Sequence, residues 1–292
     1  MSFLKNIKNN KIQLAQIGLV LTTFVWGITF IMVKEALQDA PPFAFTAFRF
    51  MLASFGTLFI LRKNILDINR LEIIGGIICG IFLFSGYGFQ NFGLVVTTAS
   101  KSAFITGVSI ILVPVFLVIA GIQKIRLKIW GSVLLAVIGL FLLLNPSGDG
   151  INRGDILTMG CAASFGIHII VQDRFTRKKV QVFQFFIVQA TIVSILSFGG
   201  HILFETQSVI WSQRLIIALA ITGIFATLAG ISIMIWAQKV LSPTRTAIIF
   251  TMEPIFAALF AMLIAGEMLS IQGWTGGFLI LLGIIWAETG RE

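Results

Sequence analysis

The chain has 292 residues, of which 57% are hydrophobic and only 11% are charged. Soluble domains average about 25% charged residues, and a water-soluble fold of this length cannot bury so much apolar surface, so the composition indicates a membrane protein. The net charge of +9 is explained by membrane orientation and by attraction to anionic lipid headgroups. It therefore gives no support for nucleic-acid binding.

Apolar stretches separated by short polar connections run through almost the whole chain. A helix needs about 20 apolar residues to cross a hydrocarbon core of about 30 Å. With that window the spans are 14–33, 43–61, 72–92, 99–120, 127–145, 154–172, 182–203, 214–236, 243–265 and 269–288. We therefore expect an all-α membrane protein with ten transmembrane helices.

The basic residues alternate in abundance from one connection to the next. If the N-terminus is cytoplasmic, 16 of the 21 Lys and Arg residues lie on the cytoplasmic side. The other side holds only Lys34, Lys101, Arg153 and Arg214, and Arg49 lies within a span. Because short loops retain Lys and Arg in the cytoplasm, both termini are predicted to be cytoplasmic, in the inner membrane.

The two halves of the sequence resemble each other in order and spacing. KSAFI at 101–105 aligns with RTAII at 245–249, and the match continues to Gly139 and Gly283. FVWGITFIMVK at 24–34 similarly matches ASFGIHIIVQD at 163–173. Five helices per copy is an odd number, so the second copy is inverted in the membrane. We expect two five-helix repeats, residues 1–146 and 147–292, around a central cavity that alternately opens to either side.

Glu253 and Arg49 are the charged residues placed deepest in the predicted spans. A charge near the bilayer centre costs roughly 2.5–3.5 kcal/mol on insertion scales. Glu253 therefore faces a cavity, pairs with a cation or is protonated; it is a candidate for proton coupling or for binding a substrate amine, or it bonds the backbone loosened by Pro254. Arg49 has a fork that suits a carboxylate, either of the substrate or in a structural ion pair.

Two pairs of residues are candidates for opening and closing the cavity. Lys101 and Arg245 are related by the repeat and occupy the first turns of their helices. They are either gates or anion contacts, or their side chains only snorkel to the membrane interface. Pro114 and Pro254 lie inside spans, where each frees a carbonyl group and kinks its helix. Such kinks serve as hinges or are merely structural.

Further polar and aromatic side chains within the spans are candidates to line the path. Ser164, His168 and Gln172 share one helical stripe, and His168 is either a proton relay or a hydrogen bonder between helices. The remaining candidates, of which Gln189 matches Arg49 in the repeat, are Trp26, Tyr87, Gln90, Asn91, Gln189 and Trp236.

The sequence lacks the motifs of enzymes and ATP-driven pumps. It contains no GxxxxGK[ST] phosphate-binding loop, and His168 and His201 are its only histidines, without a metal-binding or catalytic pattern around them. Cys79 and Cys161 fall in different spans, so no disulfide is expected. We expect no enzymatic activity, no cofactor and no metal.

Four segments resemble the repeat signatures of the drug/metabolite transporter superfamily, in particular its ten-helix exporters with two EamA-type repeats. They are FVWGITFIMVKEAL at 24–37, AFRFMLASF at 47–55, TTASKSAFI at 97–105 and EPIFAALFAMLIAGEMLSIQGWTGGFLILLGI at 253–284. The first copy departs from the pattern, with Ser109-Ile110 in place of Glu-Pro and Gln123 in place of Glu. The two halves are therefore expected to contribute unequally to coupling.

The resemblance implies a secondary-active exporter of amino acids, including aromatic ones, or of similar small metabolites, with protons as a coupling ion. Its partners would be the substrate and membrane lipid, with the protein a monomer or a weak homodimer. One alternative is a sugar-phosphate or nucleotide-sugar exchanger that binds phosphate through Lys101 and Arg245. A second is an accessory membrane subunit that transports nothing itself.

Overall fold

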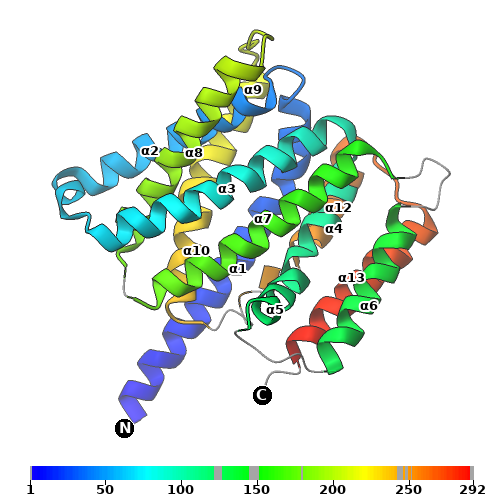
Figure 1. Cartoon of the computed structure of the whole chain (residues 1–292), viewed down its shortest axis with the longest axis horizontal. Helices are drawn as coiled ribbons and strands as arrows, with labels where there is room; N and C mark the ends of the chain where they lie inside the picture. The colour runs from blue at the N-terminus through cyan, green and yellow to red at the C-terminus, as the bar shows by residue number, and fades with distance from the viewer. Residues whose placement is uncertain are drawn as a thin grey trace.

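The computed structural model describes residues 2–121, 127–144, 151–178, 180–241, 246, 249–250 and 252–289. Within them the chain is built from helices that run across one bundle (Figure 1). The first half contains α1 (Ser2–Ala36), α2 (Pro42–Leu61), η1 (Arg62–Asp67), α3 (Arg70–Val96), α4 (Ala99–Gly107), α5 (Ser109–Ile119) and α6 (Leu127–Leu144). The second contains α7 (Arg153–Thr176), α8 (Val182–Phe204), α9 (Gln213–Ala220), η2 (Ile221–Ala229), α10 (Gly230–Gln238), α12 (Met252–Ala265) and α13 (Ile271–Thr289).

These helices confirm the predicted membrane architecture. In the described part of the chain, seven apolar helical segments are long enough to cross a membrane, with α4–α5 and α9–η2–α10 each forming one segment. Shorter apolar helices at 130–139, 252–265 and 271–283 lie in the fifth, ninth and tenth predicted spans. Residues 243–245, which begin the ninth predicted span, lie outside the described residues.

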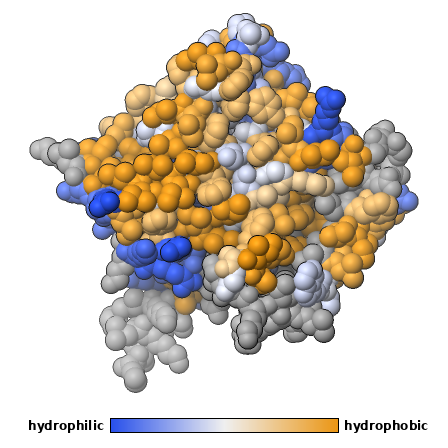
Figure 2. Space-filling view, in the orientation of Figure 1, coloured by the Kyte–Doolittle hydropathy of each residue, from blue (hydrophilic) through white to orange (hydrophobic). Residues whose placement is uncertain are grey.

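The surface is that of a protein surrounded by lipid. Apolar residues cover most of the face seen in Figure 2, and the most hydrophilic ones gather at its margins. Large apolar side chains are exposed on several helices, for example Phe59 on α2, Phe225 on η2 and Phe278 on α13. A contiguous apolar surface of this kind would be unstable in water. The protein is therefore a multi-pass membrane protein.

Hydrogen-bonding side chains define where several helices begin. Asn69 and Glu72 form a capping box at the start of α3, and Asn152 and Asp155 form the equivalent box at the start of α7. A capping box satisfies two backbone N–H groups that the helix leaves free. α2 instead starts at Pro42, where a missing N–H costs nothing. These local signals fix the ends of the apolar segments.

Helices from one half pack on helices from the other. α1 lies against α12 and α7 lies against α4 and α5, so the first helix of each half packs on the fourth of the other half. Gly27 and Gly166, which align in the repeat, allow these contacts: a Cβ on Gly27 would lie 2.5 Å from Phe256, and one on Gly166 would lie 3.3 Å from the Ser109 carbonyl oxygen. α2 packs on α8 and α6 on α13 in the same reciprocal way. This arrangement is that of an inverted repeat, as the sequence predicted.

Polar contacts tie the two halves together at the face where α1 ends and α9 begins. The Asp39 carboxylate accepts bonds of 2.8 Å from Nε and 2.8 Å from Nη2 of Arg214, and one of 2.6 Å from Ser212 Oγ. Arg214 Nη1 also lies 3.3 Å from a Glu35 carboxylate oxygen. Hydrogen bonds from Arg214 and Ser212 lower the pKa of Asp39 from 3.8 to about 2. We call Glu35, Asp39, Ser212 and Arg214 the Asp39 cluster.

Replacing Asp39 by asparagine is expected to lower the melting temperature in detergent at pH 7 by a few degrees. A depressed folded-state pKa stabilises the fold above the ordinary pKa of the carboxyl, and this stabilisation disappears as pH falls. The difference in melting temperature between wild type and Asp39→Asn should therefore be constant from pH 7 to 5 and decline between pH 4 and 2. Glu35→Gln is the control, because its half-exposed carboxylate should contribute little. An Asp39→Asn effect that does not change with pH would contradict this assignment.

Candidate functional site

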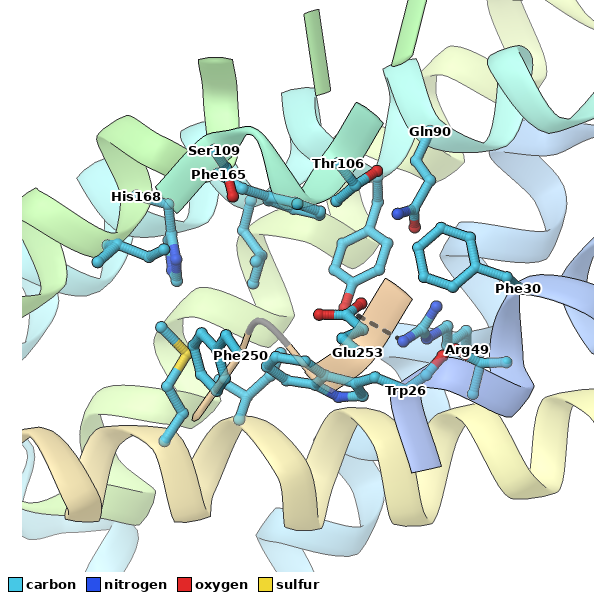
Figure 3. Close-up of a pocket in the computed structure, with 17 residues that line it drawn as sticks. Trp26, Phe30, Arg49, Gln90, Thr106, Ser109, Phe165, His168, Phe250 and Glu253 are labelled. Carbon is cyan, nitrogen blue, oxygen red and sulfur yellow. Dashed lines mark hydrogen bonds between the residues drawn. The ribbon is translucent and has the colours of Figure 1, made fainter. Parts of the chain in front are cut away.

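A cavity of about 70 Å³ lies in the middle of the bundle, between the two halves. Its walls come from α1, α2, α3, α4 and α5 of the first half and from α7, α10 and α12 of the second. A single water needs roughly 10–15 Å³ measured in this way, so the cavity holds several water-sized particles. Figure 3 shows charged groups at one side of it and His168 at the other, with aromatic rings between them.

Arg49 contributes a buried positive charge to the cavity. The residue is 2% exposed, and its Nε donates a 2.7 Å hydrogen bond to Thr227 Oγ1 on η2. Its Nη2 donates to the Tyr87 hydroxyl at 3.2 Å, and the guanidinium carbon lies 4.4 Å from the centre of the Tyr87 ring. Among the described residues, no carboxylate lies within 4.0 Å of Arg49. The sequence-based alternative of a structural ion pair thus finds no partner there.

Glu253 contributes the only carboxyl group among the residues described as lining the cavity. It lies in α12, and Figure 3 shows the carboxyl group beside the Arg49 guanidinium. Within the described structure it makes no hydrogen bond and no ion pair. The cavity therefore presents a cation and a carboxyl group that lie near each other but do not pair.

Aromatic rings form much of the remaining wall. Trp26 and Phe250 lie with ring centres 5.2 Å apart, and Tyr87 and Phe165 are also 5.2 Å apart, edge to face. The Trp26 indole Nε1 donates a 2.8 Å bond to the Ala226 carbonyl oxygen, so its ring is held at a fixed angle. Such walls suit an apolar or aromatic group, and they also attract cations.

His168 ends a chain of buried polar side chains that leads away from the cavity. Its Nε2 lies 2.9 Å from Gln189 Oε1, Gln189 Nε2 donates to Gln172 Oε1 at 3.4 Å, and Gln172 Nε2 donates to Gln238 Oε1 at 3.0 Å. Of these four residues only His168 lines the cavity. His168 thus bonds between α7 and α8, which was one of its two sequence-based interpretations, and its role as a relay stays a prediction.

The structure brings together six of the residues that the sequence proposed for the site: Trp26, Arg49, Tyr87, Gln90, His168 and Glu253. Four others lie elsewhere. Asn91 Nδ2 donates to Thr46 Oγ1 at 2.8 Å behind the cavity wall, Gln189 is fully buried behind His168, Lys101 is in the first turn of α4, and Trp236 packs against the apolar core. Arg245 lies outside the described residues.

The two proposed hinge prolines lie in α5 and α12. Pro114 is inside α5, whereas the break between α4 and α5 falls at Val108. Pro254 is in α12, and its ring is the nearest neighbour that a Cβ on Gly107 would meet. Their role as hinges stays a prediction.

Several lining residues escaped the sequence analysis, among them Phe30, Thr106, Phe165, Met234 and Phe250. Phenylalanine occurs 28 times in the chain, so composition alone does not single out the few that face a cavity. The clearest available signal was position: Thr106 and Phe250 lie in or near the segments that match between the two halves.

A bundle of apolar helices in two inverted halves, with a charged cavity between them, is an arrangement typical of membrane transporters. The sequence profile of the EamA-like transporter family matches residues 13–145 and again residues 152–289. The chain therefore belongs to the EamA-like transporter family.

Proteins of similar sequence match nearly the whole length of the chain. An uncharacterized transporter of Archaeoglobus fulgidus is 34% identical over 93% of this chain and 84% of its own. Proteins named probable amino-acid metabolite efflux pump are 25% identical in Salmonella typhimurium and 24% identical in Escherichia coli, each over 91% of both chains. A solved crystal structure has the same fold, with a TM-score of 0.71 and 18% identity over 94% of this chain and 96% of that one.

Proposed function

We propose that this protein exports amino acids, or small metabolites built like them, across the cytoplasmic membrane by alternating access. One observation carries the proposal: Arg49 and Glu253 line the same side of the cavity but form no ion pair with each other. An α-amino acid is a zwitterion, whose carboxylate suits the Arg49 fork and whose ammonium group suits a carboxylate at Glu253. The aromatic walls beside them would take an apolar or aromatic side chain.

Alternating access requires that the polar contacts between the halves separate and re-form. The Asp39 cluster joins the connection after α1 to the start of α9, and the Glu267 carboxylate accepts bonds of 3.0 and 3.1 Å from the backbone N–H groups of Ala99 and Ser100 at the start of α4. Both contacts lie on the face opposite the start of α1. With the termini in the cytoplasm, this is the external face, and we infer that it is closed in this conformation.

The halves 1–146 and 147–292 would act as the two moving units, in a monomer or a weak homodimer. Protonation of Glu253 would couple transport to the pH gradient, because a neutral carboxyl releases the ammonium group that a carboxylate holds. Lys101 and Arg245 would contribute only to gating.

The exchange of phosphorylated sugars has less support. A phosphate carrying two negative charges calls for several convergent cations, whereas Arg49 is the one Lys or Arg among the described lining residues. Lys101 does not line the cavity. An accessory role without transport is tested by the same experiment, because such a protein moves no solute when reconstituted alone.

Counterflow into proteoliposomes tests the proposal directly. Vesicles containing the purified protein and loaded with an unlabelled L-amino acid should accumulate the same labelled amino acid, whereas empty vesicles should not. A panel of L-phenylalanine, L-leucine, L-threonine, L-glutamate and glucose 6-phosphate would identify the side-chain class. We expect the apolar amino acids to be preferred. The corresponding amines, which lack the carboxylate, and the N-acetyl derivatives, which lack the ammonium group, should be poorer substrates. Transport of glucose 6-phosphate alone, or of nothing, would refute the proposal.

A further inference from the structure

The eighth membrane-crossing segment is not a continuous α-helix. Between α9 and α10 the chain winds as a π-helix, η2, over the nine residues Ile221–Ala229. π-Helices are rare, appear mostly as single turns within α-helices, and often mark functional sites. They hold one more residue per hydrogen-bonded turn than an α-helix, so a return to α-helix leaves a backbone carbonyl without its usual donor.

A backbone carbonyl group within η2 holds Trp26. In an α-helix the Gly230 N–H would donate to the Ala226 carbonyl oxygen, four residues earlier. Here the Gly230 N–H instead bonds to the carbonyl oxygens of Phe225 and Thr227, and the Ala226 carbonyl oxygen accepts the Trp26 indole Nε1 at 2.8 Å. In the π-helix the Gly230 N–H thus leaves the carbonyl oxygen that fixes the angle of Trp26, an aromatic wall of the cavity.

The next residue along η2 holds Arg49. Thr227 is fully buried, and its Oγ1 accepts the 2.7 Å bond from Arg49 Nε. With Nε engaged by Thr227 and Nη2 engaged by Tyr87, Nη1 is left without a bond in the described structure. The fork of Arg49 is therefore held from two sides, with part of it free for a ligand.

Two glycines, one in η2 and one at the start of α10 directly after it, allow this segment to lie close to the site. A Cβ on Gly230 would stand 2.9 Å from Trp26 Nε1, and one on Gly223 would stand 3.1 Å from the Arg49 carbonyl oxygen. Both distances are shorter than side chains tolerate without a shift of their neighbours. The close approach of η2 to α1 and α2 thus occurs at the two residues that the site uses.

We propose that η2 positions the binding site. The Ala226 carbonyl oxygen sets the angle of the Trp26 ring, and the Thr227 hydroxyl sets the orientation of the Arg49 guanidinium group. Because both groups come from one helix of the second half and hold residues of the first, η2 joins the halves at the substrate. The proposal rests on the proposed function for what the site binds. The positioning itself is a statement about two hydrogen bonds, which are measured separately.

Deleting Ile224 tests the role of the π-helix. This residue faces lipid, and removing one residue from η2 should restore an α-helix in which Gly230 bonds to Ala226. The indole N–H resonance of Trp26 can be assigned in the NMR spectrum of tryptophan-labelled protein as the one that Trp26→Phe removes. In the deletion variant we expect this resonance to shift to the position of an indole without a hydrogen bond. Binding of L-phenylalanine should weaken about tenfold or more. The substitution Ile224→Ala keeps the residue count and should change neither.

Thr227→Val tests the second contact without altering the helix. It should weaken L-phenylalanine binding about tenfold, because a charge-assisted hydrogen bond is lost, and shift the Nε–H resonance of Arg49 while leaving that of Trp26 in place. Thr227→Ser should restore both. Thr222→Val is the matched control, because its hydroxyl lies in the same π-helix but bonds only to the Ala218 carbonyl oxygen.

The two readouts separate failure of this proposal from failure of the proposed function. If wild-type protein does not bind L-phenylalanine but the resonances shift as stated, the positioning is supported and the proposed ligand is wrong. If the folded deletion variant keeps the wild-type Trp26 resonance, or if Thr227→Val behaves like Thr222→Val in the Arg49 resonance, then η2 does not position the site. If the deletion variant does not fold, the Thr227 series decides alone.

Discussion

Arg49→Gln is expected to reduce amino-acid transport at least about 30-fold while the protein still folds. Arg49 is buried and cationic, and no described carboxylate lies within ion-pair distance, so a bound substrate carboxylate would be its counter-ion. Removing one partner of a buried charge pair costs 2–5 kcal/mol or more, which is about 30-fold to several thousand-fold in affinity. Counterflow of the preferred L-amino acid in proteoliposomes measures the loss.

A second substrate distinguishes binding from folding. The amine that corresponds to the amino acid lacks the carboxylate, so Arg49→Gln should transport it no worse than wild type does. Arg49→Lys keeps the charge but loses the planar fork, and we expect it to recover only part of the transport. Equal losses for the amino acid and its amine would show that Arg49 supports the structure rather than the substrate.

The membrane architecture followed from the sequence because a crossing helix needs an unbroken apolar run. Each of the ten predicted spans contains apolar helix, and the repeat predicted which helices of the two halves correspond. What the sequence did not predict were the irregularities within spans, namely the break at Val108 and the π-helix at Ile221–Ala229. Neither contains a proline, and hydropathy is the same for an α-helix and a π-helix, so the pattern carries no sign of them.

The deep charges of the site were also visible in the sequence, because polar groups in a membrane are costly and therefore few. Whether such a group faces the cavity depends on the rotation of its helix and on its neighbours. Gln90 lines the cavity whereas Asn91, the next residue, bonds to Thr46 behind it. Gln189 matches Arg49 in the repeat, yet it is enclosed by His168 and Gln172. Tertiary contacts decide these cases.

Gly266 and Glu267 lie within the segment 253–284 that resembles a family repeat signature, and the structure shows what these two residues do. Gly266 has a φ of 63°, a conformation that costs other residues about 1–2 kcal/mol. The turn brings the Glu267 carboxylate across to the free N–H groups that begin α4, where the helix dipole favours a negative charge. A residue that appeared as part of a family pattern thus connects the two halves.

Glu253→Gln is the substitution expected to separate substrate binding from coupling. The amide keeps the size of the side chain but cannot be ionised, so it neither takes up a proton nor attracts an ammonium group with a full charge. We expect accumulation driven by a pH gradient to fall to the level seen without a gradient. Counterflow at equal pH should remain measurable, reduced about tenfold by the weaker hydrogen bond to the ammonium group.

The control for this prediction is Glu253→Asp, which retains an ionisable group and should retain a response to the gradient. Transport at several equal internal and external pH values should depend on pH in wild type and in Glu253→Asp but not in Glu253→Gln. Because Glu253 is the only carboxyl group among the described residues of the cavity wall, no neighbour there is placed to substitute for it. Unchanged transport with unchanged pH dependence in Glu253→Gln would remove this residue from the mechanism and leave Arg49 as the sole charged contact of the substrate.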